Sequence, residues 1–183
     1  KYFNQSEEKW KWQRPLLFGT TEDLFTQTIV VPYLIPMLER AGAIVFTPRE
    51  RDWQANEIIV DNDNDGSGYT EEHGSWKKAK GEGFKMHWED YSDGENPFAA
   101  GTVRQVKAKK KGGASASWQP YIPEAGRYAV YVSYKTVSKS VPDAHYIVFH
   151  KGQRTDVQVN QQMGGSTWVY IGTYDFDEGS GLD

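Results

Sequence analysis

Acidic side chains at regular spacing carry the clearest chemical signal in this sequence. Between residues 61 and 72 they occupy the ligand positions of a twelve-residue calcium-binding loop: Asp61, Asp63, Asp65 and Glu72. Carboxylates at alternate positions can converge on Ca²⁺, Gly66 permits the sharp turn, and Glu72 can close the coordination shell with both of its oxygens. A solvated acidic turn is the favoured interpretation of this stretch, and a calcium site is the alternative.

The surroundings of this loop differ from those of an EF-hand, in which two helices flank the loop. Residues 56–60 are expected to form a strand instead, and Gly68 stands where the EF-hand has an apolar residue. Calcium binding and a solvated turn therefore both stay open.

Glu22 is a second residue whose position could do chemistry. It follows Thr20 and Thr21, whose hydroxyls can cap a helix, and the free N–H groups of a helix start favour negative charge. Two interpretations follow. Glu22 either belongs to a well-capped helix start, or it is a metal ligand or acid–base residue of an α/β enzyme.

The element that must position this glutamate is a long apolar helix. Pro32 and Pro36 each remove a backbone donor, so we expect a kink near Val31, and Gly42 is suited to end the helix. One face of the helix is expected to pack on a sheet: Thr28, Val31, Leu34, Ile35 and Leu38. Residues 43–47 then predict a short buried strand, which would make this segment an α/β unit.

The second half of the chain changes to an alternating period. Six segments predict strands: 102–109, 114–119, 126–135, 144–151, 155–160 and 167–176. Glycine and proline separate them, which is typical of an antiparallel β-sandwich. Four alternating side chains are expected to line its core: Tyr128, Val130, Val132 and Tyr134.

The sequence therefore predicts an α+β protein in three parts. Residues 1–65 would form the partial α/β unit, and residues 84–183 would form the antiparallel β-sandwich. Residues 66–83 are rich in Gly, Ser, Lys and Glu, and we expect them to be an exposed linker.

Composition narrows the classes of function. A formal net charge of −4 and a pI near 5.6 provide no broad basic field, so nucleic acid is not an expected partner. No apolar run reaches the roughly 20 residues that a membrane-spanning helix needs. The sequence has no cysteine, which excludes disulfides and thiolate sites. Seven Trp and eleven Tyr favour a β-rich protein that binds through its surface.

Three short motifs between residues 19 and 52 occur in the same order as in one enzyme family. GTTE (19–22) precedes the apolar helix, RAG (40–42) ends it, and TPRERD (47–52) follows the expected strand. In this order they resemble the zinc-dependent N-acetylmuramoyl-L-alanine amidases. The resemblance implies hydrolysis of an amide bond of peptidoglycan, with Glu22 as one of three zinc ligands.

The other zinc ligands of that family, two histidines, and its late catalytic glutamate are not recognisable in this sequence. Its four histidines stand in other settings: His73, His87, His145 and His150. The resemblance therefore implies that this chain alone is hydrolytically inert, and that segments outside it would complete the zinc site.

Four motifs in the second half also occur in a recognisable order: WQPYIPEAGRY (118–128), DAHY (143–146), VNQ (159–161) and GGSTWVYIGTY (164–174). Over residues 81–183 they resemble the golvesin C-terminal, or xanthan-lyase carbohydrate-binding-like, domain. The resemblance implies a β-sandwich that binds polysaccharide and is joined to secreted bacterial hydrolases. It also implies closing strands beyond Asp183.

Sugar-binding sites stack aromatic rings on pyranose rings. Four aromatic side chains within the matching motifs are candidates for this role, and core packing is the alternative for each: Trp118, Trp168, Tyr170 and Tyr174. Four lysines form a basic run: Lys107, Lys109, Lys110 and Lys111. They are interpreted either as a solvated strand edge or as a surface that binds an acidic polysaccharide.

Together these observations predict part of a secreted, periplasmic or cell-surface bacterial hydrolase that acts on cell wall or polysaccharide. The alternative is a non-catalytic carbohydrate-binding or structural surface module.

Overall fold

A computed structural model describes residues 2–11, 22–46, 56–64, 66, 68–86, 95–109 and 112–180. The chain divides into two units. Unit 1 comprises Lys1–Ala55 and Ser92–Glu95, and unit 2 comprises Asn56–Tyr91 and Asn96–Asp183. No helix within the described ranges is both long and apolar enough to cross a lipid bilayer.

Unit 1 begins with a short antiparallel hairpin of β1 (Tyr2–Asn4) and β2 (Lys9–Lys11). The Asn4 side chain organises the turn, because its Oδ1 accepts hydrogen bonds from the amides of Ser6 (3.0 Å) and Glu7 (3.3 Å). An asparagine that bonds to the backbone two and three residues later is a common way of closing a turn.

The expected apolar helix is present in three consecutive segments. They are α1 (Glu22–Ile29), the π-helical η1 (Val30–Leu34) and α2 (Ile35–Arg40). The irregularity predicted near Val31 takes the form of the π-helical segment, which contains Pro32. Gly42 ends the helix as predicted, with φ of +88° and a hydrogen bond of 2.9 Å from its amide to the Glu39 carbonyl.

The buried strand predicted for residues 43–47 was wrong for the residues that the structure describes. Residues 43–46 belong to no strand, and the side chains of Ile44 and Phe46 are 85% and 91% exposed. On the preceding helix Ile35 is buried, whereas Leu38 is 41% exposed. Regular spacing of apolar residues indicates that one face of a helix can be buried. It does not show that a sheet is present to bury that face. The α/β unit is therefore not shown within the described part of unit 1.

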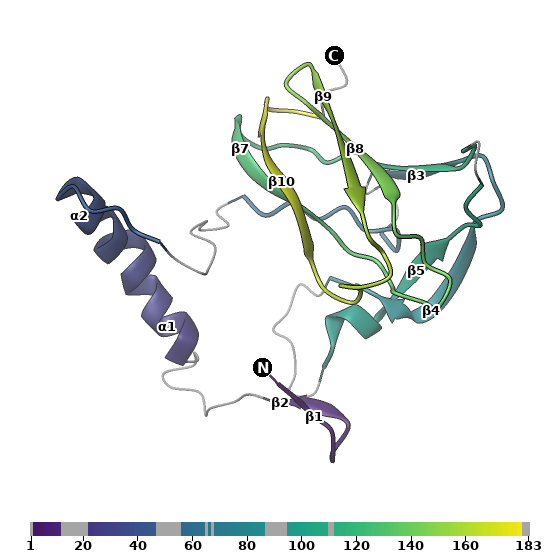
Figure 1. Cartoon of the computed structure of the whole chain (residues 1–183), viewed down its shortest axis with the longest axis horizontal. Coiled ribbons are helices and arrows are strands. Elements are labelled where there is room, and N and C mark those ends of the chain that lie inside the picture. Colours follow the sequence, from purple (N-terminus) through teal and green to yellow (C-terminus); the bar gives the residue numbers. More distant parts are fainter. Residues whose placement is uncertain are drawn as a thin grey trace. The chain divides into compact units, whose positions relative to one another are not determined.

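Unit 2 consists mainly of antiparallel strand pairs (Figure 1). Its elements in chain order are β3 (Tyr69–Glu72), β4 (Lys77–Gly83), the 3₁₀ helix η2 (Pro97–Ala99), β5 (Gly101–Gln105), β6 (Ser115–Trp118), β7 (Gly126–Val132), β8 (Ala144–His150), β9 (Gln153–Val159) and β10 (Val169–Phe176). The pairs are β3 with β6, β4 with β5, β7 with β10, and β8 with β9. Each of the six strands predicted for the second half is present.

Two sequence expectations differ from the structure at the start of unit 2. Residues 56–60 form no strand, although three consecutive apolar residues suggested one. Residues 66–83, which we expected to be a linker, include β3 and β4. β4 reads KKAKGEG, so backbone pairing with β5 holds it rather than an apolar face of its own.

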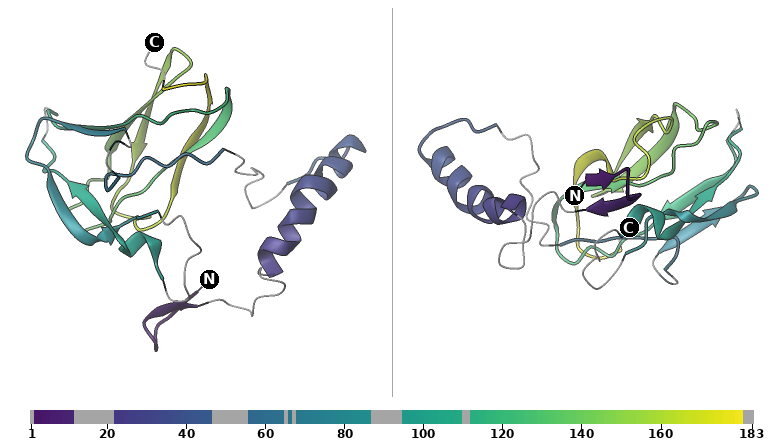
Figure 2. Two further views of the ribbon diagram at one scale, coloured as in Figure 1. Left: turned by 180° about the vertical axis from the view of Figure 1, so that it is seen from behind. Right: turned by 90° about the horizontal axis from the view of Figure 1, so that it is seen from below.

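Alternation along the strands separates an inner and an outer face. In the view from below in Figure 2, β8 and β9 lie in one layer and β4 and β5 in another. The buried apolar side chains of unit 2 include Ile122, Val148 and Val159. Aromatic rings pack around them in two groups, Phe84 with Phe98 and Trp168, and Tyr128 with His150, Tyr174 and Phe176.

Two loops near one end of unit 2 are held together by residues of the glycine-rich motif. The Tyr134 hydroxyl donates to the Met163 carbonyl at 2.7 Å, and the Gly165 amide donates to Thr136 Oγ1 at 3.1 Å. A Cβ on Gly165 would clash with the backbone nitrogen of Thr136. Glycine is therefore required here by close approach of two backbone segments. Tyr134 is half-buried, lies beyond the end of β7 and anchors a loop, and its expected place at the core stays a prediction.

Candidate functional site

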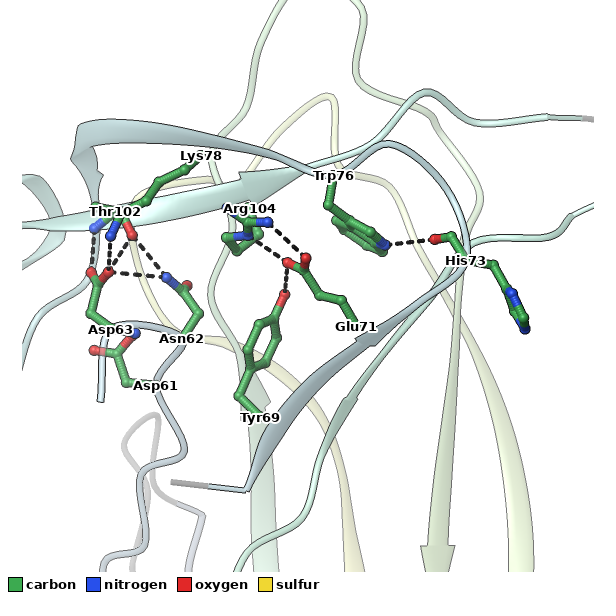
Figure 3. Close-up of polar contacts among 10 residues, drawn as sticks. All are labelled: Asp61, Asn62, Asp63, Tyr69, Glu71, His73, Trp76, Lys78, Thr102 and Arg104. Atoms are coloured by element: carbon green, nitrogen blue, oxygen red, sulfur yellow. Dashed lines mark hydrogen bonds and ion pairs between the residues drawn. The ribbon is translucent and has the colours of Figure 1, made fainter. Parts of the chain in front are cut away.

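The start of the acidic loop is tied to strand β5 (Figure 3). Asp63 accepts hydrogen bonds from the Thr102 amide (2.6 Å) and hydroxyl, and Lys78 Nζ lies 3.4 Å from Asp63 Oδ1. Asn62 Nδ2 donates to Thr102 Oγ1 at 2.8 Å. Asp61 Oδ1 accepts from the Asp63 amide at 3.1 Å, which closes a turn of the backbone.

The two aspartates of this loop differ in their electrostatics. Burial raises the pKa of the Asp61 carboxyl, whose residue is only 7% exposed. Burial acts in the same direction on Asp63, but hydrogen bonds from Thr102 and Lys78 outweigh it and hold the pKa of Asp63 below its ordinary value. The loop therefore holds one carboxylate that is stabilised in its charged form and one that is not.

The remaining predicted calcium ligands are less well placed. Asp65 lies outside the described residues, and Glu72 is an exposed residue at the end of strand β3. Within the described ranges, no group of three or more His, Asp or Glu side chains could hold a metal ion. Calcium binding by Asp61, Asp63, Asp65 and Glu72 stays a prediction.

A partly buried ion pair joins β3 to β5 beside this loop (Figure 3). Arg104 binds both carboxylate oxygens of Glu71, with Nε–Oε1 and Nη2–Oε2 distances of 2.5 and 2.7 Å. The Tyr69 hydroxyl also donates to Glu71, at 2.7 Å, and the Tyr69 ring contacts Trp118 at a centroid distance of 5.4 Å. Arg104 first, and Tyr69 as well, hold the pKa of Glu71 below its usual value.

Glu22 is the first residue of α1, which confirms the predicted helix start. Thr20 and Thr21, its expected capping neighbours, lie outside the described residues, as do residues 47–52 of the third amidase-like motif. Neither the described structure nor the relatives given below support the amidase-like part, and Glu22 as a zinc ligand stays a prediction.

The outer face of β7 and β10 brings two tyrosine rings together at the protein surface. Tyr131 and Tyr170 are direct cross-strand partners, and their tilted rings lie 5.5 Å apart between centroids. Tyr170 is 55% exposed, and its hydroxyl lies 2.7 Å from Thr173 Oγ1. We refer to Tyr131, Tyr170 and Thr173 as the tyrosine face.

A β-bulge in β10 creates this arrangement. The register shifts between Tyr170 and Gly172, so that Tyr170 and Thr173, three residues apart, both lie on the outer face. Gly172 adopts φ of +144°, and a Cβ there would clash with the Tyr174 hydroxyl. That hydroxyl donates to the Ile171 carbonyl at 2.8 Å and so fixes the bulge from the inner side.

Charged residues continue the same outer face along the strands. Arg127 on β7 and Asp175 on β10 are direct cross-strand partners, and both are exposed. At about 3.3 Å per residue, Arg127 lies roughly 13 Å along β7 from Tyr131. The face therefore offers aromatic surface at one end and charged hydrogen-bonding groups at the other.

The four aromatic residues proposed for glycan binding differ in their surroundings. Tyr170 is on the tyrosine face, and Trp118 is 48% exposed beside Tyr69. Trp168 is 39% exposed, but its ring packs against Phe84 with centroids 4.7 Å apart. Tyr174 is half-buried, and its ring packs on His150 at 4.7 Å, which is a structural role. Glycan binding by Trp118, Trp168, Tyr170 and Tyr174 stays a prediction.

Two histidines lie on opposite faces of β8, as the spacing predicted. His145 is exposed and lies 2.6 Å from Asp156 Oδ1, whereas the half-buried His150 lies 2.9 Å from Thr155 Oγ1. They cannot share a metal ion. In the basic run, Lys107 and Lys109 are exposed, and the other two lysines lie outside the described residues.

Sequence reasoning did not identify the half-buried Tyr131 as part of a possible ligand-binding surface. Its neighbours Val130 and Val132 were predicted to face the core, so the alternation of the strand already placed Tyr131 outward. What the sequence did not show was its cross-strand partner, because pairing with Tyr170 depends on the register of two distant strands.

Residues 58–182 match the golvesin C-terminal domain, which is more than half of the chain. The chain belongs to the golvesin C-terminal domain family. The matched range begins two residues after the first residue of unit 2, so the golvesin domain and unit 2 nearly coincide. The resemblance seen in the sequence motifs is confirmed for this part of the chain.

Two proteins with related names match part of this chain. A protein named xanthan lyase from Bacillus sp. (strain GL1) is 33% identical over 124 residues, which cover 68% of this chain and 12% of the relative. The solved structure of a Paenibacillus xanthan lyase matches with a TM-score of 0.52 and 28% identity, covering 67% of this chain and 10% of that one. The chain thus spans about a tenth of the length of each relative.

Proposed function

We propose that unit 2 is a sandwich-type, glycan-binding module of a secreted protein that acts on polysaccharide. The tyrosine face is the observation that carries this proposal. Two adjacent rings, one of them more than half exposed, present aromatic surface beside the hydroxyls of Tyr170 and Thr173. Aromatic faces stack on the apolar faces of pyranose rings, while hydroxyl groups bind the sugar hydroxyls.

Support for polysaccharide as the ligand comes from the family and from the two relatives named xanthan lyase. Because this chain spans only about a tenth of each relative, their lyase activity is not part of the proposal. Peptidoglycan was the other polymer predicted from the sequence, and it stays an alternative ligand to be tested beside xanthan.

Affinity electrophoresis in gels containing xanthan or soluble peptidoglycan fragments tests the proposal. We expect the protein to be retarded by one of these polymers, and Tyr170→Ala to abolish most of the retardation. Tyr121→Ala is the matched control, because Tyr121 is 64% exposed and lies outside the β7–β10 pair.

Equal loss of retardation in both variants, or none in Tyr170→Ala, would contradict a site on the tyrosine face. A folded protein that no glycan polymer retards would favour the alternative of a structural module. Gly165 and Tyr174 are motif residues whose roles are accounted for by packing, and this observation keeps the structural alternative in consideration.

A further inference from the structure

The hairpin of β8 and β9 has an outer face that the tyrosine face does not include. On β8 the side chains of Val148 and Tyr146 point inward, so Ile147 and Phe149 lie on the opposite side and are 39% and 57% exposed. Phe149 is the direct cross-strand partner of Arg154. An exposed aromatic residue and an exposed arginine are therefore cross-strand neighbours on this hairpin.

The guanidinium of Arg154 binds a carboxylate on the same strand. Its Nε and Nη2 donate to the two carboxylate oxygens of Asp156 at 3.1 and 2.6 Å. His145 Nε2 lies 2.6 Å from the same carboxylate and supports it from the neighbouring strand. Arginine has five N–H groups, so three of them remain for a ligand after these two contacts.

This arrangement contributes little to stability, because both partners of the ion pair are about half exposed to water. Its main physical effect is to reduce the number of orientations that Arg154 adopts. An arginine whose fork is already oriented loses less conformational entropy when it binds a planar anion such as a carboxylate.

The charges of the hairpin are distributed unevenly. Lys151 lies in the turn between the strands, where Lys151 and Gly152 have φ of 44° and 67°, as in a two-residue hairpin turn. Lys151 and Arg154 outnumber Asp156 at this end, and the carboxylate of Asp143 lies before the opposite end of β8. The turn end of the hairpin is therefore the more positive end.

We propose that Phe149 and Arg154 form a second saccharide contact that selects sugar units bearing a carboxylate. Phe149 stacks on the sugar ring, and the free N–H groups of Arg154 bind the carboxylate. This inference rests on the proposed glycan binding and names the class of sugar. Charge complementarity favours an acidic saccharide as the ligand. A second copy of this chain has a net negative charge, but if it bound through the same hairpin, two basic ends would face each other.

The test compares a tetramer of galacturonic acid with its fully methyl-esterified form, which has the same rings but no free carboxylates. Titration calorimetry of the whole chain should show tighter binding of the acid form. Arg154→Gln should weaken binding of the acid form about tenfold and leave the ester unchanged, since one charge-assisted contact is lost. Phe149→Ala should weaken the binding of both forms.

Lys77→Gln is the control for the change of net charge, because Lys77 is an exposed residue of β4 and not of the hairpin. It should leave the preference for the acid intact. Equal affinity of the wild-type protein for acid and ester would overturn the carboxylate selection while the proposed glycan binding stands. Failure of both forms to bind, although a polymer retards the protein in gels, would also overturn this second contact.

Sedimentation analysis tests whether a second copy of the chain, rather than a saccharide, binds to this face. A dimer that dissociates in Phe149→Ala but not in Lys77→Gln would assign this face to a second copy of the chain and overturn the saccharide proposal. A monomer at the concentrations of the titration supports it.

Discussion

At the scale of single residues, the motif of residues 164–174 combines outward-facing and inward-facing side chains in one short stretch. Tyr170 faces outward, whereas Tyr174, four residues later, faces inward and bonds to the Ile171 carbonyl. The bulge at Gly172 makes this division, because it shifts which residues share the outer face. Aromatic content alone could not distinguish the two tyrosines, since both occur in the same motif.

The bulge can be tested with Gly172→Ala. A Cβ at this position would displace the Tyr174 hydroxyl, and the φ of +144° disfavours any residue with a Cβ. We expect a loss of about 1–3 kcal/mol in the free energy of unfolding, measured in urea, together with weaker retention by polysaccharide.

Gly126→Ala is its control, because the nearest atom to a Cβ there is Tyr128 Cε2 at 3.9 Å, an ordinary contact. If Gly172→Ala were as stable and as well retained as Gly126→Ala, the bulge would not be what positions the tyrosine face.

The acidic loop gives a second prediction at the residue scale. If residues 61–72 bind calcium, calorimetric titration should show heat of binding that Asp63→Asn reduces, since this is the loop carboxylate stabilised in its charged form. No heat at millimolar calcium would instead identify the loop as a turn, held to β5 by Thr102 and Asn62.

At the scale of elements, sequence reasoning succeeded where strands alternate between a wet and an apolar face. It located all six strands of the second half, because glycine and proline mark their ends. It failed at residues 43–46, where apolar side chains lack partner strands in the described structure. It also missed β3 and β4, whose polar residues read as a linker but whose backbones pair with β6 and β5.

The ion pair between β3 and β5 should make stability depend on pH. Arg104 lowers the pKa of Glu71 in the folded state, so the pair contributes stability above the ordinary glutamate pKa. That contribution is lost as the pH falls through the lowered pKa of the folded protein. Glu71→Gln should therefore be destabilised at pH 7 by about 1–3 kcal/mol.

Thermal unfolding between pH 3 and pH 7 measures this dependence. The difference in melting temperature between wild type and Glu71→Gln should shrink as the pH falls. A difference that stayed constant over this range would mean that ionised Glu71 does not stabilise the fold through Arg104.

At the scale of the whole molecule, the two halves differ in how far their function can be assigned. Unit 2 nearly coincides with a known domain family, and its motifs were recognisable in the sequence. The candidate sites were only partly predictable from the sequence. Strand register, and not sequence spacing, makes Tyr131 a cross-strand partner of Tyr170, and Phe149 a partner of Arg154. Unit 1 has a confirmed helix, but the zinc site inferred from it stays a prediction.

The golvesin domain is proposed to bind glycan through the tyrosine face. The most direct measurement is a map of backbone amide chemical shifts during titration with oligosaccharides released from xanthan. We predict that the largest changes cluster at Tyr131, Tyr170 and Thr173. Changes confined to other surfaces of unit 2, or no changes with a glycan that retards the protein in gels, would contradict the claim.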